Sequence, residues 1–368
     1  MADSPGARVL VVGLGDLGGR VLEMLAASPR IQTLLGCGQA GSHSAAVVAQ
    51  SALIADTLGG ATQVEHLATD LTDRAAVATM LRGAAPDIVV FAASRHSWWR
   101  SPPAARALPY GVWLPLQLSL LRTFMLAHRD GASTAVVIAL PHPDAAGPVL
   151  AADGLAPLAG AGNVAEVAAK LRLLTAAEFG CHRDDVEVRL VLHHAAERLA
   201  FALFDAAPSG GGAPPYLARV TARSLPVAPE VVDRLLRQAY PLPGGTGSHQ
   251  LTAATVVQLV DALLADEQRH LHVPSPAGLP GGYPVLVSRR GVELDLPVGI
   301  SRGDAIAVNE QAAAFDGISA IGADGTIRYT PDAIVAAHDL LGLTLQDTPI
   351  AALDEAADRL EVVLRAVR

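Results

Sequence analysis

The sequence predicts an α/β protein with a parallel sheet in its first half, and three observations support this fold class. Short β-branched, apolar runs alternate with helical segments through the first 140 residues. A glycine-rich turn joins the first of these runs to the first helix. The second half has longer helices, strands of alternating polarity and short hairpins, which indicates a separate α+β unit. We therefore predict two domains, residues 1–147 and residues 148–368.

In the first half, helices connect successive buried strands, as βαβ units require. The run RVLVV at residues 8–12 is apolar on both faces, which is typical of a parallel strand covered on both sides. The other predicted strands are residues 31–35, 87–92 and 134–140, and the predicted helices are residues 19–27, 73–81 and 115–127.

The second half begins with a long helix and ends with two more. The predicted helices are residues 162–179, 252–266, 332–341 and 350–367. The predicted strands and hairpins are residues 186–192, 216–224, 284–288, 291–296 and 317–329, with a loop rich in proline and glycine at residues 206–215.

Composition excludes several classes of protein. The chain has 368 residues, of which 51% are hydrophobic and 17% charged, so it is not intrinsically disordered. No unbroken apolar stretch approaches the roughly 18–20 residues of a membrane span. A net charge of −9 argues against a nucleic-acid-binding protein with a broad basic face. We therefore expect a small-molecule substrate, with neither a nucleic acid nor a membrane as partner.

Cysteine content and the first residues suggest a compartment. Two cysteines, Cys37 and Cys181, form neither a disulfide framework nor a zinc site, so no metal is predicted. Residues 1–8 lack the basic and then apolar pattern of a signal peptide. Both observations favour a cytoplasmic protein.

The glycine-rich turn is the most informative motif. Gly13-Leu14-Gly15-Asp16-Leu17-Gly18 lies between a strand and a helix, which is the context of a dinucleotide-binding, Rossmann-type turn. In such a turn the first glycine permits the tight bend, the second lets the backbone approach a pyrophosphate, and the third lets helix and strand pack closely. The helix N-terminus then offers N–H groups to the phosphates. The alternative is a turn that binds no ligand.

The choice between NAD and NADP depends on the end of the second strand. An acidic residue there would bind the ribose 2′-hydroxyl of NAD, but residues 36–38 are Gly-Cys-Gly. Ser42 and His43 follow, and they are candidates to hydrogen-bond a ribose or its 2′-phosphate. The missing carboxylate favours NADP slightly and leaves NAD open.

Five segments after residue 90, in order and spacing, resemble the lactate/malate dehydrogenase family. They are Ala92-Ala93-Ser94-Arg95 followed by Pro102, residues 136–144 (VVIALPHPD), residues 160–166 (GAGNVAE), residues 191–197 (VLHHAAE), and residues 252–297 with the hairpin Arg290-Gly291-Val292-Glu293. The resemblance covers about residues 8–300. It implies a Rossmann domain followed by an α+β substrate domain, an NAD(P) cofactor, and a homodimer.

The resemblance also implies roles for individual residues. It places Ala92 and Ala93 beside the cofactor and gives Arg95 the task of polarising the substrate carbonyl. The catalytic histidine matches His194 or His193, and the carboxylate that orients it matches Glu166. Asn163 and Ser248 line the expected substrate pocket, and Trp98 and Arg100 belong to the loop that covers it.

Three departures from the family pattern concern the substrate. The arginine that grips a substrate carboxylate is replaced by Ala169, the asparagine of the family's Asn-Pro-x-Asp by Pro141, and the glycine after the histidine by Ala195. These changes indicate that a 2-hydroxy acid is not held in the usual way, and that an aldehyde or imine is also a possible substrate.

Hydride transfer to a carbonyl or imine needs a proton donor, and histidine suits that task because its pKa lies near neutrality. Successive residues of a strand point to opposite faces, so we expect only one of His193 and His194 to face the site. Lys170, the only lysine, is one helical turn from Glu166. It forms either a plain helix pair or a contact to substrate.

Two alternative functions remain open at this stage. Asp70 lies in Thr69-Asp70-Leu71, a segment that resembles saccharopine-dehydrogenase-like reductases, in which it would reach the adenine. The lost arginine and asparagine also fit a degenerate protein that binds a dinucleotide without catalysis.

Overall fold

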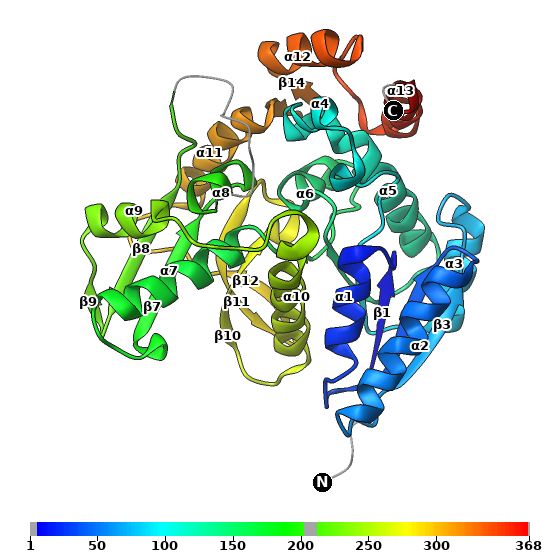
Figure 1. Cartoon of the computed structure of the whole chain (residues 1–368), viewed down its shortest axis with the longest axis horizontal. Coiled ribbons are helices and arrows are strands. Elements are labelled where there is room, and N and C mark those ends of the chain that lie inside the picture. The colour runs from blue at the N-terminus through cyan, green and yellow to red at the C-terminus, as the bar shows by residue number, and fades with distance from the viewer. Residues whose placement is uncertain (1–5, 202–211, 367–368) are drawn as a thin grey trace.

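The computed structural model describes residues 6–201 and 212–366 (Figure 1). Its N-terminal half is a six-stranded parallel sheet in the order β3-β2-β1-β4-β5-β6. The strands are β1 (Ala7–Val12), β2 (Ile31–Gly38), β3 (Gln63–Ala68), β4 (Ile88–Phe91), β5 (Val136–Ala139) and β6 (Ala159–Gly160). This order reverses direction between β1 and β4, where a doubly wound fold places its ligand crevice.

Helices cover both faces of this sheet because its strands are apolar on both sides. Leu10 and Val12 of β1 pack into one buried cluster, while Val9 and Val11 pack into the other. The helices are α1 (Asp16–Leu25), α2 (Ser42–Thr57), α3 (Arg74–Ala84), α4 (Pro103–Arg106), α5 (Leu114–Asp130) and α6 (Pro143–Ala151). Two short 3-10 turns, η1 (Trp98–Arg100) and η2 (Tyr110–Trp113), lie in the loop between β4 and α5.

The second half contains two antiparallel three-stranded sheets, β7-β8-β9 and β10-β11-β12. The elements are α7 (Val164–Glu178), β7 (Val186–Val191), α8 (His194–Ala200), β8 (Leu217–Ala222), β9 (Leu225–Pro226), α9 (Pro229–Arg237), α10 (His249–Leu264), β10 (Arg269–Pro274), β11 (Gly282–Ser288), β12 (Gly291–Leu294) and α11 (Arg302–Ala313). Helix α10 lies beside α1 and joins the two halves (Figure 1).

The C-terminal segment, residues 314–366, returns to the first half. It contains the 3-10 turn η6 (Ala314–Asp316), β13 (Ile318–Ile321), β14 (Ile327–Tyr329), α12 (Pro331–Leu341) and α13 (Leu353–Ala366). Helix α13 packs against α5 (Figure 1), and its buried Leu360 and Leu364 belong to the same apolar cluster as Leu121 of α5.

The predicted fold class is confirmed, with a parallel α/β sheet followed by an α+β region. The sixth strand lies at Ala159–Gly160, after the predicted domain boundary at residue 147. The division into two domains at that residue stays a prediction. Residues 206–211 of the predicted proline- and glycine-rich loop lie outside the described residues. None of the helices in residues 6–201 and 212–366 is long and apolar enough to cross a membrane.

Candidate active site

The glycine-rich turn has the geometry that its sequence predicts. Gly13 adopts a φ of +92°, and a Cβ atom there would lie 2.5 Å from the backbone nitrogen of Ala93. A Cβ atom on Gly18 would lie 1.9 Å from the carbonyl oxygen of Gly13. At Gly15, by contrast, a Cβ atom would meet no other atom within 4 Å. Gly13 and Gly18 are therefore required by packing, while Gly15 leaves open space beside the backbone.

The N-terminus of α1 adjoins this open space. Gly15 is the N-cap residue and has no side chain to bind the first N–H groups of the helix, so these remain available to an anion. The carboxylate of Asp16 in the first turn is bound by Arg20 at 3.2 Å and by Nδ1 of His249 at 2.6 Å. Burial alone would raise the pKa of Asp16, but these two partners lower it. The turn fits a pyrophosphate, with the charge of Asp16 compensated.

The remaining cofactor candidates lie at the carboxyl ends of the central strands or next to them. The amide of Ala92 donates to the carbonyl oxygen of Val12 at 2.7 Å, so Ala92 and Ala93 lie beside the glycine turn as expected. Leu17 is half-buried at the start of α1 and packs against the apolar cluster beneath it. Ser248, buried at the start of α10, donates to the carbonyl oxygen of Gly245.

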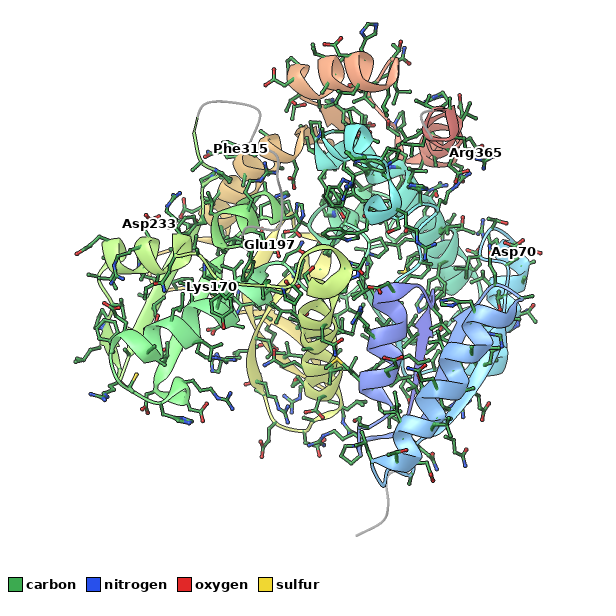
Figure 2. All side chains as sticks on the ribbon, in the orientation of Figure 1. Asp70, Lys170, Glu197, Asp233, Phe315 and Arg365 are labelled. Atoms are coloured by element: carbon green, nitrogen blue, oxygen red, sulfur yellow. The ribbon has the colours of Figure 1, made fainter. Side chains whose placement is uncertain are left out.

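At the end of β2, Ser42 is the first residue of α2 and His43 is exposed on that helix. The hydroxyl of Ser44 donates to the carbonyl oxygen of Gln39 and lies 2.9 Å from Nε2 of His66. Asp70 lies at the outer edge of the sheet (Figure 2), where its carboxylate accepts from the amide and hydroxyl of Thr72. This arrangement stabilises a local turn, and a contact of Asp70 with adenine stays a prediction.

The second half of the site is a buried cluster of histidines and carboxyls at the carboxyl end of β5. Nδ1 of His194 lies 2.7 Å from Oδ2 of Asp316, and Nδ1 of His193 lies 3.5 Å from the same oxygen. Arg198 contacts the other oxygen of Asp316 at 3.3 Å. Asp316 has no exposed surface. A fully buried carboxylate therefore faces three basic side chains from the start of α8.

This environment sets opposite protonation states for the two histidines. Burial acts to lower the pKa of His194, but the charge and hydrogen bond of Asp316 outweigh it and raise the pKa to about 9. The pKa of Asp316 itself is lowered well below its ordinary value, although burial opposes the change. His193 has a lowered pKa because burial outweighs its charged neighbours. Near neutrality, His194 is an imidazolium and His193 is neutral.

Two expectations about these histidines are wrong. Asp316, rather than Glu166, pairs with Nδ1 of His194. Both histidines also approach Asp316, because they do not lie within a strand. His193 is the N-cap of α8, where its Nδ1 accepts from the amide of Ala195, and His194 is the first helical residue. The alternation of faces within a strand does not apply at such a junction.

Asp144 and Asn163 support the cluster from the next two segments. The side-chain amide of Asn163 donates to Oδ2 of Asp144, and the backbone amide of His194 donates to Oδ1 at 3.2 Å. Asp144 lies in the first turn of α6, directly after β5. Asn163 thus holds a carboxylate that fixes the start of α8, and its predicted contact to substrate stays a prediction.

Glu166 belongs to a different pair within the same cluster. It hydrogen-bonds to Glu197 of α8 and accepts from the hydroxyl of Thr252 at 2.7 Å. Burial raises the pKa of both carboxyls, to about 7 for Glu197. Two adjacent buried carboxyls share a proton because both cannot ionise in this environment. Within the described part of the chain, neither of them has an ion pair.

Lys170 does not contact Glu166, and neither role predicted for it is found. Its Nζ donates to the carbonyl oxygens of Ala200, Leu236 and Gln238 at 2.6–2.7 Å. These carbonyls end α8 and α9, so the ammonium group joins two helix C-termini, where a cation is favourable. Figure 2 shows Lys170 on α7, apart from Glu197. Lys170 has a structural role in this arrangement.

Arg95 is also turned away from its expected role. Its guanidinium pairs with Glu361 at 2.9 Å and Asp358 at 2.5 Å, both on α13. Nη1 also donates to the carbonyl oxygen of Asp354. The C-terminal segment, which lies outside the resemblance on which the expectation rested, therefore holds the side chain that should polarise the substrate.

The aromatic residues of the same loop pack around the cluster. Trp98 contacts Trp99 and Tyr110 edge to face, and the guanidinium of Arg106 lies 5.7 Å from its ring. Tyr110 stacks on His194 with ring centroids 4.5 Å apart. Arg100 ends η1 with its side chain exposed. Tyr110 of this loop thus lies against the histidine cluster, and a role of Trp98 and Arg100 in covering the substrate stays a prediction.

Sequence reasoning did not single out five residues in or against the cluster: Asp316, Glu197, His142, Asp144 and Arg198. Glu197 lies in the quoted segment VLHHAAE, one helical turn after His194, and recognising a helix there would have found it. Asp316 follows His194 by more than a hundred residues, and no local pattern signals it.

His142 is the least satisfied of these side chains. It is 1% exposed, and neither ring nitrogen has a hydrogen-bond partner among the residues described. Its backbone is left-handed, with a φ of 41°. Each buried polar atom without a partner costs about 1–3 kcal/mol, and a strained backbone adds to this. Burial also lowers the pKa of His142 to about 3, so its ring is neutral.

Comparison with solved structures identifies the fold. The chain is similar to a lactate dehydrogenase of Cryptosporidium parvum complexed with lactic acid and nicotinamide adenine dinucleotide, with a TM-score of 0.59 and 16% identity over 85% of this chain and 99% of that one. For a malate dehydrogenase of the same organism, the TM-score is 0.58 and the identity is 13%, over 84% of this chain and 96% of that one. For a lactate dehydrogenase of Eimeria maxima with NADH and oxamate, the TM-score is 0.58 and the identity is 10%, over 85% of this chain and 94% of that one.

Sequence comparison alone finds no relative. No protein-family model matches the chain, and no curated protein matches it. The identity to the solved structures is low, but their similarity covers most of this chain and nearly all of theirs. The chain therefore has the fold of lactate and malate dehydrogenases, with low sequence identity to these solved structures.

Proposed function

We propose that this protein is an NAD(P)-dependent oxidoreductase that reduces a carbonyl or imine carbon. His194 acts as the proton donor, and Asp316 is the carboxylate that positions it. The observation that carries the proposal is the pairing of His194 with a fully buried carboxylate. A histidine–carboxylate pair of this kind fixes the orientation of the ring and stabilises the imidazolium.

The site is built at one edge of the parallel sheet. The glycine turn follows β1, Ala92 and Ala93 follow β4, and Asp144 follows β5. Carboxyl ends of parallel strands meet at the same edge, so the dinucleotide turn and the histidine cluster lie at the same edge of the sheet. When bound there, a nicotinamide cofactor would supply or accept the hydride.

The raised pKa of His194 favours reduction. With a pKa of about 9 the ring carries its proton at neutral pH, ready to be donated to an oxygen or nitrogen that gains negative charge. His193 and His142 stay neutral beside it because burial lowers the pKa of each. Of the three rings, His194 is therefore the one loaded with a proton. NADPH is the favoured donor of hydride, since β2 ends without an acidic residue.

The test combines cofactor binding with turnover. NADPH and NADH are titrated against the protein, and cofactor oxidation is then followed with 2-oxo acids, ketones, aldehydes and cyclic imines. His194→Gln is expected to lower kcat about 100-fold or more while leaving cofactor Kd unchanged. His128→Gln is the control, because His128 binds the carbonyl oxygen of Ala135 away from the cluster.

Full activity in His194→Gln would contradict the role of this histidine. Cofactor binding without turnover of any substrate would instead indicate the non-catalytic, dinucleotide-binding alternative. A failure to bind either cofactor would remove the basis of both.

A homodimer and a cytoplasmic location stay expectations from the sequence. Two exposed leucines, Leu53 in helix α2 and Leu58 at its C-cap, have 68% and 66% exposure. Burying such side chains against a second copy would be favourable, which supports a dimer. Light scattering of the wild-type protein and of Leu53→Lys is the corresponding measurement.

A further inference from the structure

His142 is a buried polar side chain at the site whose two ring nitrogens have no hydrogen-bond partner among the described residues. Its ring stacks on Tyr110 with centroids 4.7 Å apart and lies 5.8 Å from the ring of His194. Both rings lie close to His142, yet neither of its ring nitrogens bonds to a described residue. Buried polar groups almost always have partners, and strained backbone collects at functional sites. Both features indicate a group that a ligand satisfies.

The chemistry of a neutral imidazole limits what this ligand can be. One ring nitrogen donates a hydrogen bond and the other accepts one. A partner with one acceptor and one donor, such as a carbonyl or imine next to a hydroxyl or N–H group, would satisfy the ring. A carboxylate has acceptors alone, so it would leave one nitrogen unpaired.

The charges around the site also disfavour a substrate carboxylate. The position that grips a carboxylate in the lactate/malate dehydrogenase pattern is Ala169. Arg95 is bound to α13, and Arg198 is bound to Asp316. Binding an anion without a guanidinium fork in a buried site is costly.

The carboxyl pair adds to this effect. Glu166 and Glu197 are both at least nine-tenths buried and share one proton, so the pair carries negative charge, which the nearby charge of His194 partly offsets at Glu197. A second carboxylate brought into the same cluster would be repelled. A neutral substrate, or one that carries a protonated nitrogen, would not.

We propose that the substrate is a ketone, aldehyde or imine without a carboxylate on the reacting carbon, and that His142 is its specificity-determining contact. This inference rests on the proposed function. In the reaction, hydride from the dihydronicotinamide, with both electrons, forms the new C–H bond and breaks the π bond of C=O or C=N. The oxygen or nitrogen takes the proton of His194, giving an alcohol or amine and oxidised cofactor.

The first experiment uses matched substrates with the full-length protein and saturating cofactor. Each 2-oxo acid is paired with the methyl ketone that lacks its carboxylate, and cyclic imines are paired with their 2-carboxylated forms. We expect kcat/KM to be at least 10-fold higher for the member without a carboxylate. A preference for the carboxylated members would overturn this inference and leave the proposed function standing. Turnover of no substrate would overturn both.

The second experiment separates function from packing at His142. His142→Phe keeps the ring stacked on Tyr110 and removes both unpaired nitrogens, so Tm should be unchanged or higher. At the same time kcat/KM should fall at least 10-fold, mostly through KM. His272→Phe is the matched control, because Nε2 of His272 accepts from the amide of Leu190.

The control should lose Tm, since it leaves that amide unpaired, and it should keep its kinetics. A His142→Phe protein that loses Tm as His272→Phe does, with unchanged kcat/KM, would assign His142 a structural role and overturn the inference.

Discussion

The glycine turn and the histidine cluster differ in how their residues come together. The turn uses six consecutive residues, and each glycine performs a local task that can be read from the backbone around it. The cluster takes side chains from the starts of α6, α7 and α8 and from η6. Asp316, its central carboxylate, belongs to the C-terminal segment, which also packs against the loop between β4 and α5 at Gly111.

This difference shows which part of such a fold can be recognised from the sequence. A phosphate-binding turn works through backbone geometry, so its requirements persist as glycines. An acid–base cluster works through charge, and a carboxylate can be supplied from any element that reaches the right place. Here the carboxylate comes from the C-terminal segment.

The largest expected effect is in the cluster, from Asp316→Asn. The change removes the negative charge that raises the pKa of His194, so that pKa should fall toward or below its ordinary 6.5. We expect kcat at neutral pH to fall about 100-fold or more, with the pH optimum moved to lower pH. Kinetic pH profiles and NMR titration of His194 measure both effects.

Asp324→Asn is the matched control, since Asp324 is an exposed turn residue that accepts from the amide of Thr326. An unchanged His194 titration in Asp316→Asn would show that another group sets the protonation of this histidine.

The second prediction concerns two glycines of the turn, Gly18 and Gly15, which we expect to affect stability and cofactor binding differently. In Gly18→Ala the new Cβ atom would overlap the carbonyl oxygen of Gly13, so the turn must distort and Tm should fall by several degrees. In Gly15→Ala the new methyl group meets only open space, so Tm should hold while cofactor Kd rises about 10-fold or more. Thermal denaturation and cofactor titration test the pair. Equal behaviour of the two variants would contradict the assigned roles.

A neighbouring cation that lies outside the cluster gives the third prediction. Lys170→Met leaves the three carbonyl oxygens of Ala200, Leu236 and Gln238 without their donor. We expect a loss of about 3 kcal/mol or more in the free energy of unfolding, because each unpaired buried acceptor is costly. Denaturant unfolding measures the loss. The pH profile of kcat should not change. A shifted profile would indicate that Lys170 takes part in the reaction and would contradict its structural role.

The most gradual effect is the pH dependence of stability that His194 produces. Its folded pKa of about 9 exceeds its unfolded value of about 6.5, so its contribution is complete below pH 6.5 and is lost as pH rises through 9. The full change is about 3 kcal/mol. Unfolding free energies at several pH values between 6 and 10 should decline in the wild type and decline less in His194→Gln. Parallel curves would contradict the raised pKa.

The sequence predicted the parallel sheet and the glycine turn because both depend on local pattern. It also brought His193, His194 and Glu166 to one region through a resemblance in order and spacing. It did not find Asp316 as the partner of His194, because that contact joins residues far apart in the chain. The strand rule failed at His193 because the chain had already turned into a helix there.

Lys170 and Arg95 show a second limit of sequence reasoning. Lys170 drew attention as a candidate site residue because it is the only lysine in the sequence. Its three hydrogen-bond acceptors are backbone carbonyls, which no residue pattern in the sequence indicates. Arg95 was assigned by resemblance, and the helix that holds it, α13, belongs to a segment that the resemblance does not cover.

The close fit between the C-terminal segment and the loop over the cluster has a consequence for motion. A Cβ atom on Gly111 of η2 would lie 2.8 Å from the carbonyl oxygen of Asp316 and 2.6 Å from Ile318. With so little space between them, the loop and the carboxylate belong to one cooperative unit. Amide hydrogen exchange should then show equal protection across residues 108–113 and 316–320. Every opening that admits solvent to the loop would also release His194 from its anion.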